Sequence, residues 1–295
     1  MPRRNILDRL RAGDVLVHDG ATGTELEARG IACAPPAWSA AANLEAPSAL
    51  RTIQDDYLRA GADIITANNY CTGPSALNQI GEAARWREYS QAGLDIALSA
   101  RDAINPNAYV AGGISTYPVP GSIFGQEYTD RARLLADGGA DFILAEYLPT
   151  VSDCVAAAEA CADIDLPLFI GVGRLNRDGN LDDGTPPETL VSALQGYRVD
   201  GLLAMCTFPP AVSKWLPRLR DSFPGFIGAY AHGGWKEPDN TRWAEEPNFD
   251  PGNPSYTPES YADYAHTWKE MGAQIIGGCC GTRPSHIAAL PAAVR

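Results

Sequence analysis

Three of the seven cysteines stand where a metal site could form. Cys206 closes one apolar segment, and Cys279 and Cys280 close another much later in the chain. Cysteine thiolates are soft ligands that favour zinc, and three of them leave the fourth position of a tetrahedral ion open to a substrate. A thiol bound there loses its proton, and thiolate is the nucleophilic form of sulfur. The three cysteines therefore suggest a zinc site that activates a thiol rather than water.

Spacing alone leaves two other interpretations of these cysteines open. Cys279 and Cys280 could form a strained vicinal disulfide, or they could be unrelated core thiols. Neighbouring residues on a regular strand point to opposite faces, so both can reach one ion only where the strand is ending. The flanking Gly277, Gly278 and Gly281 supply the backbone freedom that such an ending requires.

The elements that must position these cysteines follow a recurring pattern. A helical segment ends at a glycine and a short apolar run begins, as in 60–68, 138–146 and 271–279. Glycine suits the left-handed position that closes a helix, and continuous apolar runs suit strands buried on both faces of a parallel sheet. Eight strands are predicted, near 14–18, 63–68, 109–114, 141–147, 167–172, 201–206, 226–231 and 274–279. Helices are predicted from Pro47 and over 82–104, 128–137, 151–162, 186–197, 210–221, 258–271 and 284–294.

Eight strands that alternate with helices predict a (β/α)8 barrel, and we expect residues 1–295 to form a single domain of this kind. The first strand is not followed by Gly-x-Gly-x-x-Gly, which disfavours a dinucleotide-binding sheet. Residues 232–257 are rich in Pro, Asn and Gly and predict a long loop after the seventh strand. Long loops often act as lids or binding loops, and a disordered surface insertion is the alternative.

Active sites of such barrels lie at the carboxyl ends of the strands, where two acids are expected. Asp19 and Glu146 could act as general acid and base, or could bind the ammonium group of an amino-acid substrate. Because zinc would supply the thiolate, we favour binding of the amino group, with a salt bridge at the rim as the alternative for Glu146. His18 is expected to point away from Asp19 into packing, and His232 is a candidate for the rim of the site.

Composition narrows the class of protein. The formal net charge of −13 disfavours a nucleic-acid partner, because an acidic surface repels phosphate. The sequence contains no run of 18 apolar residues, so no membrane span is expected. No apolar segment follows the first charged residues, so no signal peptide is expected. Seven cysteines, an odd number, are expected to be thiols rather than a disulfide framework. The expected location is the cytoplasm.

At these motifs the sequence resembles the homocysteine S-methyltransferase family, which includes the betaine- and S-methylmethionine-homocysteine methyltransferases. The matching segments are 19–26 (DGATGTEL), 60–66 (AGADIIT), 145–147 (AEY) and 276–282 (IGGCCGT). The resemblance spans nearly the whole chain and implies a (β/α)8 barrel. The zinc ligands that it implies are Cys206, Cys279 and Cys280, and the residues that it implies for holding homocysteine are Asp19, the Gly20 backbone and Glu146.

The resemblance also implies an onium methyl donor, such as a betaine or the sulfonium S-methylmethionine. Trp38, Tyr70 and Tyr147 stand at positions similar to those of the family's donor pocket, and aromatic faces attract such cations. Ordinary packing is the alternative for each. Two positions depart from the family beside the site: Met205 replaces a common asparagine, and His232 replaces the asparagine of a Tyr-Pro-Asn segment.

The expected reaction is zinc-dependent transfer of a methyl group from an onium donor to homocysteine thiolate, giving methionine. The two departures leave open a related thiol or selenol acceptor and a different donor. A zinc hydrolase or lyase on the same barrel, or a non-catalytic protein that binds quaternary ammonium compounds, is the alternative from another class. The expected partners are small molecules, and the oligomeric state stays open between a monomer and a homo-oligomer.

Overall fold

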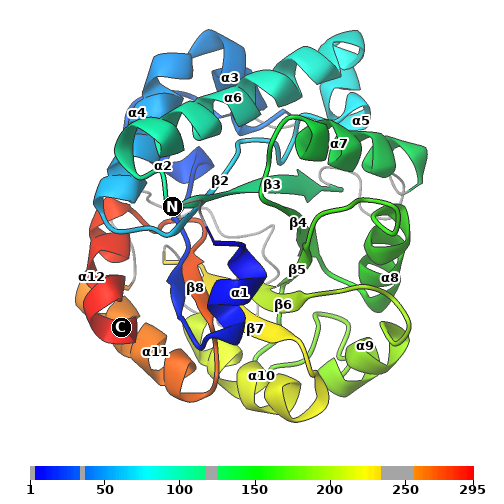
Figure 1. The fold of residues 1–295 in the computed structure, drawn as a ribbon, viewed down its shortest axis with the longest axis vertical. Helices are drawn as coiled ribbons and strands as arrows, with labels where there is room; N and C mark the ends of the chain where they lie inside the picture. The colour runs from blue at the N-terminus through cyan, green and yellow to red at the C-terminus, as the bar shows by residue number, and fades with distance from the viewer. Residues whose placement is uncertain (1–3, 34–36, 117–124, 234–255) are drawn as a thin grey trace.

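The computed structural model describes residues 4–33, 37–116, 125–233 and 256–295, which form a barrel of eight parallel strands (Figure 1). The strands are β1 (Leu16–Val17), β2 (Ile64–Thr66), β3 (Tyr109–Ser115), β4 (Phe142–Leu148), β5 (Leu168–Gly173), β6 (Gly201–Met205), β7 (Phe226–Ala231) and β8 (Ile275–Gly278). From β2 to β8 each strand pairs in parallel with the next, and β8 pairs with β1. A parallel bridge between His18 and Ile64 joins β1 to β2 and completes the ring. The predicted barrel is confirmed.

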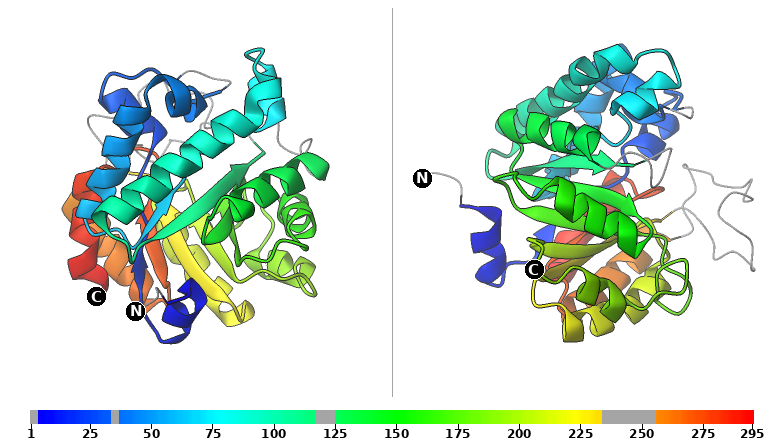
Figure 2. Two further views of the ribbon diagram at one scale, coloured as in Figure 1. Left: turned by 45° about the horizontal axis from the view of Figure 1, so that its top comes forward. Right: turned by 90° about the vertical axis from the view of Figure 1, so that its right-hand side faces the viewer.

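Helices surround the barrel on its outside, as both views of Figure 2 show. The longer ones are α4 (Pro47–Arg59), α6 (Trp86–Ile104), α7 (Gln126–Asp137), α8 (Val151–Ala160), α9 (Pro187–Ala193), α10 (Pro209–Ser222), α11 (Pro258–Glu270) and α12 (Pro284–Val294). In α4 the residues buried against the barrel include Leu50, Ile53, Tyr57 and Leu58, at the spacing of one helical face. Among the described helices, none combines the length and the apolar character needed to cross a membrane.

Several short elements were not predicted from the sequence. They are α1 (Ile6–Arg11), α2 (Gly23–Ala28), α3 (Ala42–Glu45), α5 (Pro74–Asn78) and the 3-10 turn Ser39–Ala41, whereas the 3-10 turn Ala83–Arg85 falls within the helix predicted over 82–104. Helices of four to six residues contain too few turns to show a hydrophobic period. The predicted loop over 232–257 lies almost entirely outside the described residues, which resume at Tyr256.

Helix α1 closes the end of the barrel at which the strands begin (Figure 1). Its buried Ile6 and Leu10 join the cluster that fills the barrel interior, which includes Leu16 and Ile64 at the starts of two strands. The Gln274 side-chain amide donates a hydrogen bond to the Leu10 carbonyl at 2.7 Å. The barrel therefore keeps its cavity at the other end, where the strands finish.

Replacing Leu10 with alanine should lower the free energy of unfolding by about 2–5 kcal/mol, the usual effect of removing a buried leucine side chain. Leu10 is 1% exposed and faces the interior of the barrel. Chemical denaturation measures the change, with Asp8→Ala as the control because the Asp8 side chain is 60% exposed on the same helix. A loss for Leu10→Ala no larger than that for Asp8→Ala would contradict the closing role of α1.

Candidate functional site

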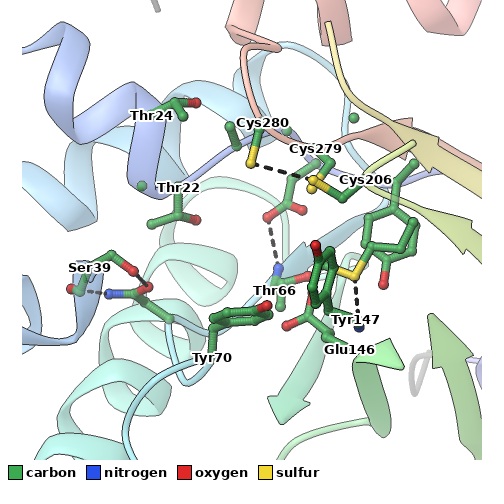
Figure 3. A pocket seen from close by; sticks show the side chains of 18 of the residues that line it. Thr22, Thr24, Ser39, Thr66, Tyr70, Glu146, Tyr147, Cys206, Cys279 and Cys280 are labelled. Atoms are coloured by element: carbon green, nitrogen blue, oxygen red, sulfur yellow. Dashed lines mark hydrogen bonds between the residues drawn. The ribbon is translucent and has the colours of Figure 1, made fainter. Parts of the chain in front are cut away.

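A cavity of about 250 Å³ lies at the carboxyl ends of the strands (Figure 3). Residues from β2, β4, β6, β7 and β8, and from the segments that follow the strands, form its walls. They are His18, Asp19, Gly20, Ala21, Thr22, Gly23, Thr24, Trp38, Ser39, Thr66, Ala67, Asn68, Tyr70, Glu146, Tyr147, Met205, Cys206, Tyr230, Gly278, Cys279 and Cys280. All of the residues predicted for the site line this cavity except His232.

The three predicted cysteines meet on one side of the cavity. The sulfur atoms of Cys206, Cys279 and Cys280 all lie within 4.8 Å of one another, and those of Cys206 and Cys280 are 3.6 Å apart. Zinc–thiolate bonds of about 2.3 Å at tetrahedral angles would separate two sulfur atoms by roughly 3.8 Å. Hydrogen bonds from the other two thiols lower the pKa of Cys280 well below its usual value. The three sulfur atoms and their spacing therefore suit a soft metal ion held by three thiolates.

Neighbouring residues face the same cavity at four strand ends, against the alternation of a regular strand. The four pairs are His18 and Asp19, Glu146 and Tyr147, Met205 and Cys206, and Cys279 and Cys280. Within β4 the pairing register shifts between Ala145 and Leu148, and Tyr147 has a φ of 60°. Cys206 has a φ of 45°, which is also rare for a side chain other than glycine. Backbone of this kind is typical of functional sites, where the surrounding structure enforces it.

Two buried acids stand beside the cysteines. Burial raises the pKa of Asp19 to about 8, against hydrogen bonds from Thr66 that lower it. Burial, and then the nearby charges of Asp19 and Cys280, raise the pKa of Glu146 to about 8. Among the described residues that line the cavity there is no lysine or arginine. The site is thus built to receive positive charge, which would favour the ionised form of both acids.

Three aromatic side chains line the same cavity. Figure 3 shows Tyr70 and Tyr147 beside Glu146, and Trp38 also contributes to the wall. The backbone N–H of Tyr147 donates to the Met205 sulfur at 3.0 Å, so Met205 supports the strained turn at Tyr147. A methyl group on Gly23 would overlap the indole nitrogen of Trp38. Gly23 therefore allows the Trp38 ring to lie against the start of α2.

The structure corrects the expectations for both histidines of the site. His232 does not reach the rim: it is fully buried and its ring packs edge-on against Phe208, with 4.5 Å between ring centroids. The seventh strand ends at Ala231, and the His232 N–H donates to the carbonyl of Thr207, which turns the residue away from the cavity. His18, expected to point away from Asp19, instead lines the cavity with its Nε2 3.3 Å from Asp19 Oδ1.

Sequence reasoning also missed several polar residues of the cavity wall. They are Thr22, Thr24, Ser39 and Thr66, none of which belongs to a spacing typical of a catalytic motif. The Ser39 hydroxyl donates to Asn68 Oδ1 at 2.7 Å, which ties the segment after Trp38 to the end of β2. The threonine-rich segment after Asp19 was the available signal, since residues that follow a barrel strand directly are placed at its carboxyl end.

Comparison with known proteins gives a consistent result over nearly the whole chain. The profile of the homocysteine S-methyltransferase family matches residues 16–294. The homocysteine S-methyltransferase of Escherichia coli is 31% identical over 319 aligned positions, which cover 99% of this chain and 98% of that protein. Betaine–homocysteine S-methyltransferase 1 of Bos taurus is 28% identical, covering 98% of this chain and 74% of its own length. The crystal structure of the metallated form of the Escherichia coli homocysteine methyltransferase MmuM has a TM-score of 0.79 at 30% identity, covering 97% of this chain and 98% of that one.

Proposed function

The chain belongs to the homocysteine S-methyltransferase family, and we propose that it transfers a methyl group from an onium donor to homocysteine thiolate, giving methionine. One observation carries the proposal most directly. A cluster of three thiols, two buried acids and three aromatic side chains share one cavity of about 250 Å³. Each group suits one part of this reaction: the sulfur nucleophile, the amino group of the acceptor and the cationic donor.

We propose that Cys206, Cys279 and Cys280 hold one zinc ion. The observed spacing of their sulfur atoms suits tetrahedral thiolate ligation, and three ligands leave one position for a substrate. Zinc bound there would keep the acceptor sulfur as a thiolate near neutral pH. Hydrolase or lyase chemistry through a bound water is less suited to this site, because three thiolates donate charge to the ion and weaken it as a Lewis acid.

We propose that Asp19 and Glu146 bind the α-ammonium group of homocysteine. Both carboxyls are buried, so a substrate cation placed between them would interact with them strongly and would stabilise their ionised forms. The Gly20 backbone borders the same space, and a side chain at this position would come within 2.8 Å of Tyr57. Holding the amino end fixes the direction of the sulfur end, which is the positioning that a one-step displacement needs.

We propose that Trp38, Tyr70 and Tyr147 bind the donor. The negatively polarised faces of their rings attract a quaternary ammonium or sulfonium group. Each favourable cation–π contact contributes about 0.5–2 kcal/mol. Tyr147 directly follows Glu146 in β4, so the donor cation would lie next to the acceptor. The methyl carbon would then lie between the leaving atom and the incoming thiolate.

A donor panel tests the proposal. Purified enzyme would be incubated with homocysteine and either betaine or S-methylmethionine, and methionine would be measured. Selenohomocysteine and other thiols in place of homocysteine would test the alternative acceptors. Zinc content near one per chain together with methionine formation is the expected result. Zinc far below one per chain that cannot be restored, or product formed equally well without any thiol, would contradict it.

Replacing Gly23 with alanine should raise the KM for the donor by about 3- to 30-fold, the range expected for loss of one cation–π contact. The added methyl group forces Trp38 out of its position, while the cysteines and acids keep theirs. Initial rates with each substrate varied in turn measure the change. Trp38→Phe should raise the donor KM as well, and Gly23→Ala should add little in that background. A rise in the KM for homocysteine instead would place Trp38 on the acceptor side.

A further inference from the structure

His18 occupies an unusual position at the closure of the barrel. Its main chain joins β1 to β2 through the bridge to Ile64, and its N–H donates to the Ile276 carbonyl of β8 at 2.9 Å. Its side chain is 3% exposed and lines the cavity. Because the closure uses only backbone atoms, the imidazole is free for another role, and replacing it leaves the closing hydrogen bonds in place.

The imidazole contacts the Asp19 carboxyl and its main support. Nε2 of His18 lies 2.7 Å from Thr66 Oγ1 and 3.3 Å from Asp19 Oδ1. The Thr66 backbone N–H donates to the other oxygen, Asp19 Oδ2, at 2.8 Å. The Tyr230 ring and the imidazole pack edge to face, with 5.0 Å between ring centroids, which restricts rotation of the imidazole. Asp19, Thr66 and His18 therefore form one hydrogen-bonded group in the cavity wall.

The position of the protons follows from the contacts. Burial lowers the pKa of His18 to about 3, so the ring is neutral and carries one N–H. An ionised Asp19 can only accept hydrogen bonds, so it needs a donor on the neighbouring Nε2. A proton on Nδ1 of His18 would have no acceptor among the described residues. The proton is therefore placed on Nε2, which donates toward Thr66 and Asp19. The Thr66 hydroxyl is then oriented to donate to Asp19, an interaction that lowers the pKa of that carboxyl.

We infer that His18 is a positioning residue for the methyl acceptor: through Thr66 it aims the Asp19 carboxylate at the α-ammonium group of homocysteine and supports the ionised form that this group requires. The inference rests on the proposed function, because it assumes that Asp19 binds the acceptor. It assigns to His18 no contact with the donor and no step in the displacement. Its effect should therefore appear in the KM for an acceptor that carries an amino group, and kcat should change little.

Three substitutions of His18 in the zinc-loaded enzyme test the inference. Leucine keeps the volume and removes the N–H, glutamine places an amide N–H near the position of Nε2, and asparagine places one near Nδ1. His18→Leu should raise the KM for homocysteine by about 10-fold, the effect of losing one hydrogen bond to a charged group. His18→Gln should recover most of this loss and His18→Asn little of it. Zinc content and near-ultraviolet circular dichroism check that metal and fold are retained.

A second substrate separates positioning from a general structural effect. 4-Sulfanylbutanoate has the thiol and carboxylate of homocysteine but lacks the amino group. With this acceptor, wild-type enzyme and His18→Leu should have the same KM within about 2-fold, because the hydrogen bond in question acts only through Asp19. Equal losses with both acceptors would overturn the inference in favour of a structural role.

Thr66→Val provides an independent test that does not depend on the stability of the His18 variants. It removes the hydroxyl, keeps the side-chain shape and leaves the Thr66 backbone N–H on Asp19. It should raise the KM for homocysteine as His18→Leu does, and the double variant should be no worse than either single one. Additive effects, or an unchanged KM in both single variants, would overturn the inference. A wild-type enzyme that leaves homocysteine unmethylated would instead contradict the proposed function.

Discussion

Replacing Cys280 with alanine is expected to remove both the bound zinc and the transfer of methyl groups. Cys280 lies 3.6 Å from Cys206, and hydrogen bonds from the other two thiols lower its pKa, which favours the thiolate that a metal ion binds. Removing a residue that hydrogen-bonds to a metal ligand typically costs about 10- to 100-fold in metal affinity or activity. Removing a ligand itself should therefore cost more than about 100-fold. Metal analysis after gel filtration and the methionine assay measure the two effects.

Cys161→Ala is the matched control for this experiment. Cys161 is also a buried thiol, but it caps the end of α8 on the outside of the barrel. Its replacement should leave zinc content and methyl transfer unchanged, although the smaller side chain will lower stability somewhat. A Cys280→Ala enzyme that keeps one zinc per chain would contradict the proposed ligand set. Zinc lost with activity retained would contradict the role of the metal and leave the ligand set intact.

Glu146→Gln should raise the KM for homocysteine by about 10- to 100-fold, because a hydrogen bond between two charged groups contributes about 1.5–3 kcal/mol. The amide keeps the shape of the carboxyl group but loses the charge that we propose faces the substrate ammonium. Zinc content should stay near one per chain, since Glu146 is not among the three clustered cysteines that are the proposed metal ligands. Initial rates over a range of homocysteine concentrations give the KM, with the donor held saturating.

Glu127→Gln is a suitable control, because Glu127 accepts a hydrogen bond from the Ser75 hydroxyl outside the cavity. Its kinetic constants should match those of the wild type. With 4-sulfanylbutanoate as the acceptor, Glu146→Gln and the wild type should also agree, because no ammonium group is present. A large drop in kcat with an unchanged KM would show that Glu146 acts in the transfer step and does not bind the amino group.

The barrel could be predicted from the sequence because its signal is repeated. Each βα unit carries an apolar run after a glycine-terminated helix, and eight such runs leave few alternative folds. The meeting of Cys206 with Cys279 and Cys280 followed from the same count, since carboxyl ends of parallel strands share one face of the barrel. Here the sequence pattern and the structure agree because topology alone brings the residues together.

The orientation of single side chains at strand ends could not be predicted in this way. Alternation places His18 and Asp19 on opposite faces, yet β1 ends at Val17, so the rule no longer applies to either residue. Glu146 and Tyr147 share a face because of a register shift in β4 that no local residue pattern indicates. The expectation for His232 was wrong because its ring packs against Phe208 and not at the cavity, a contact between distant parts of the chain that the local sequence does not indicate.

Helix α1 has a further consequence for how substrates move. By covering the end of the barrel at which the strands begin, it leaves the cavity on the side where the strands finish. Asp19 and Glu146 are buried, whereas Trp38, Tyr70 and Tyr147 are partly exposed, so under the proposed assignment the acceptor lies behind the donor. If the proposed assignment holds, homocysteine would bind before the donor, and the spent donor would leave before methionine. The rate of turnover would then depend on how quickly the spent donor is released.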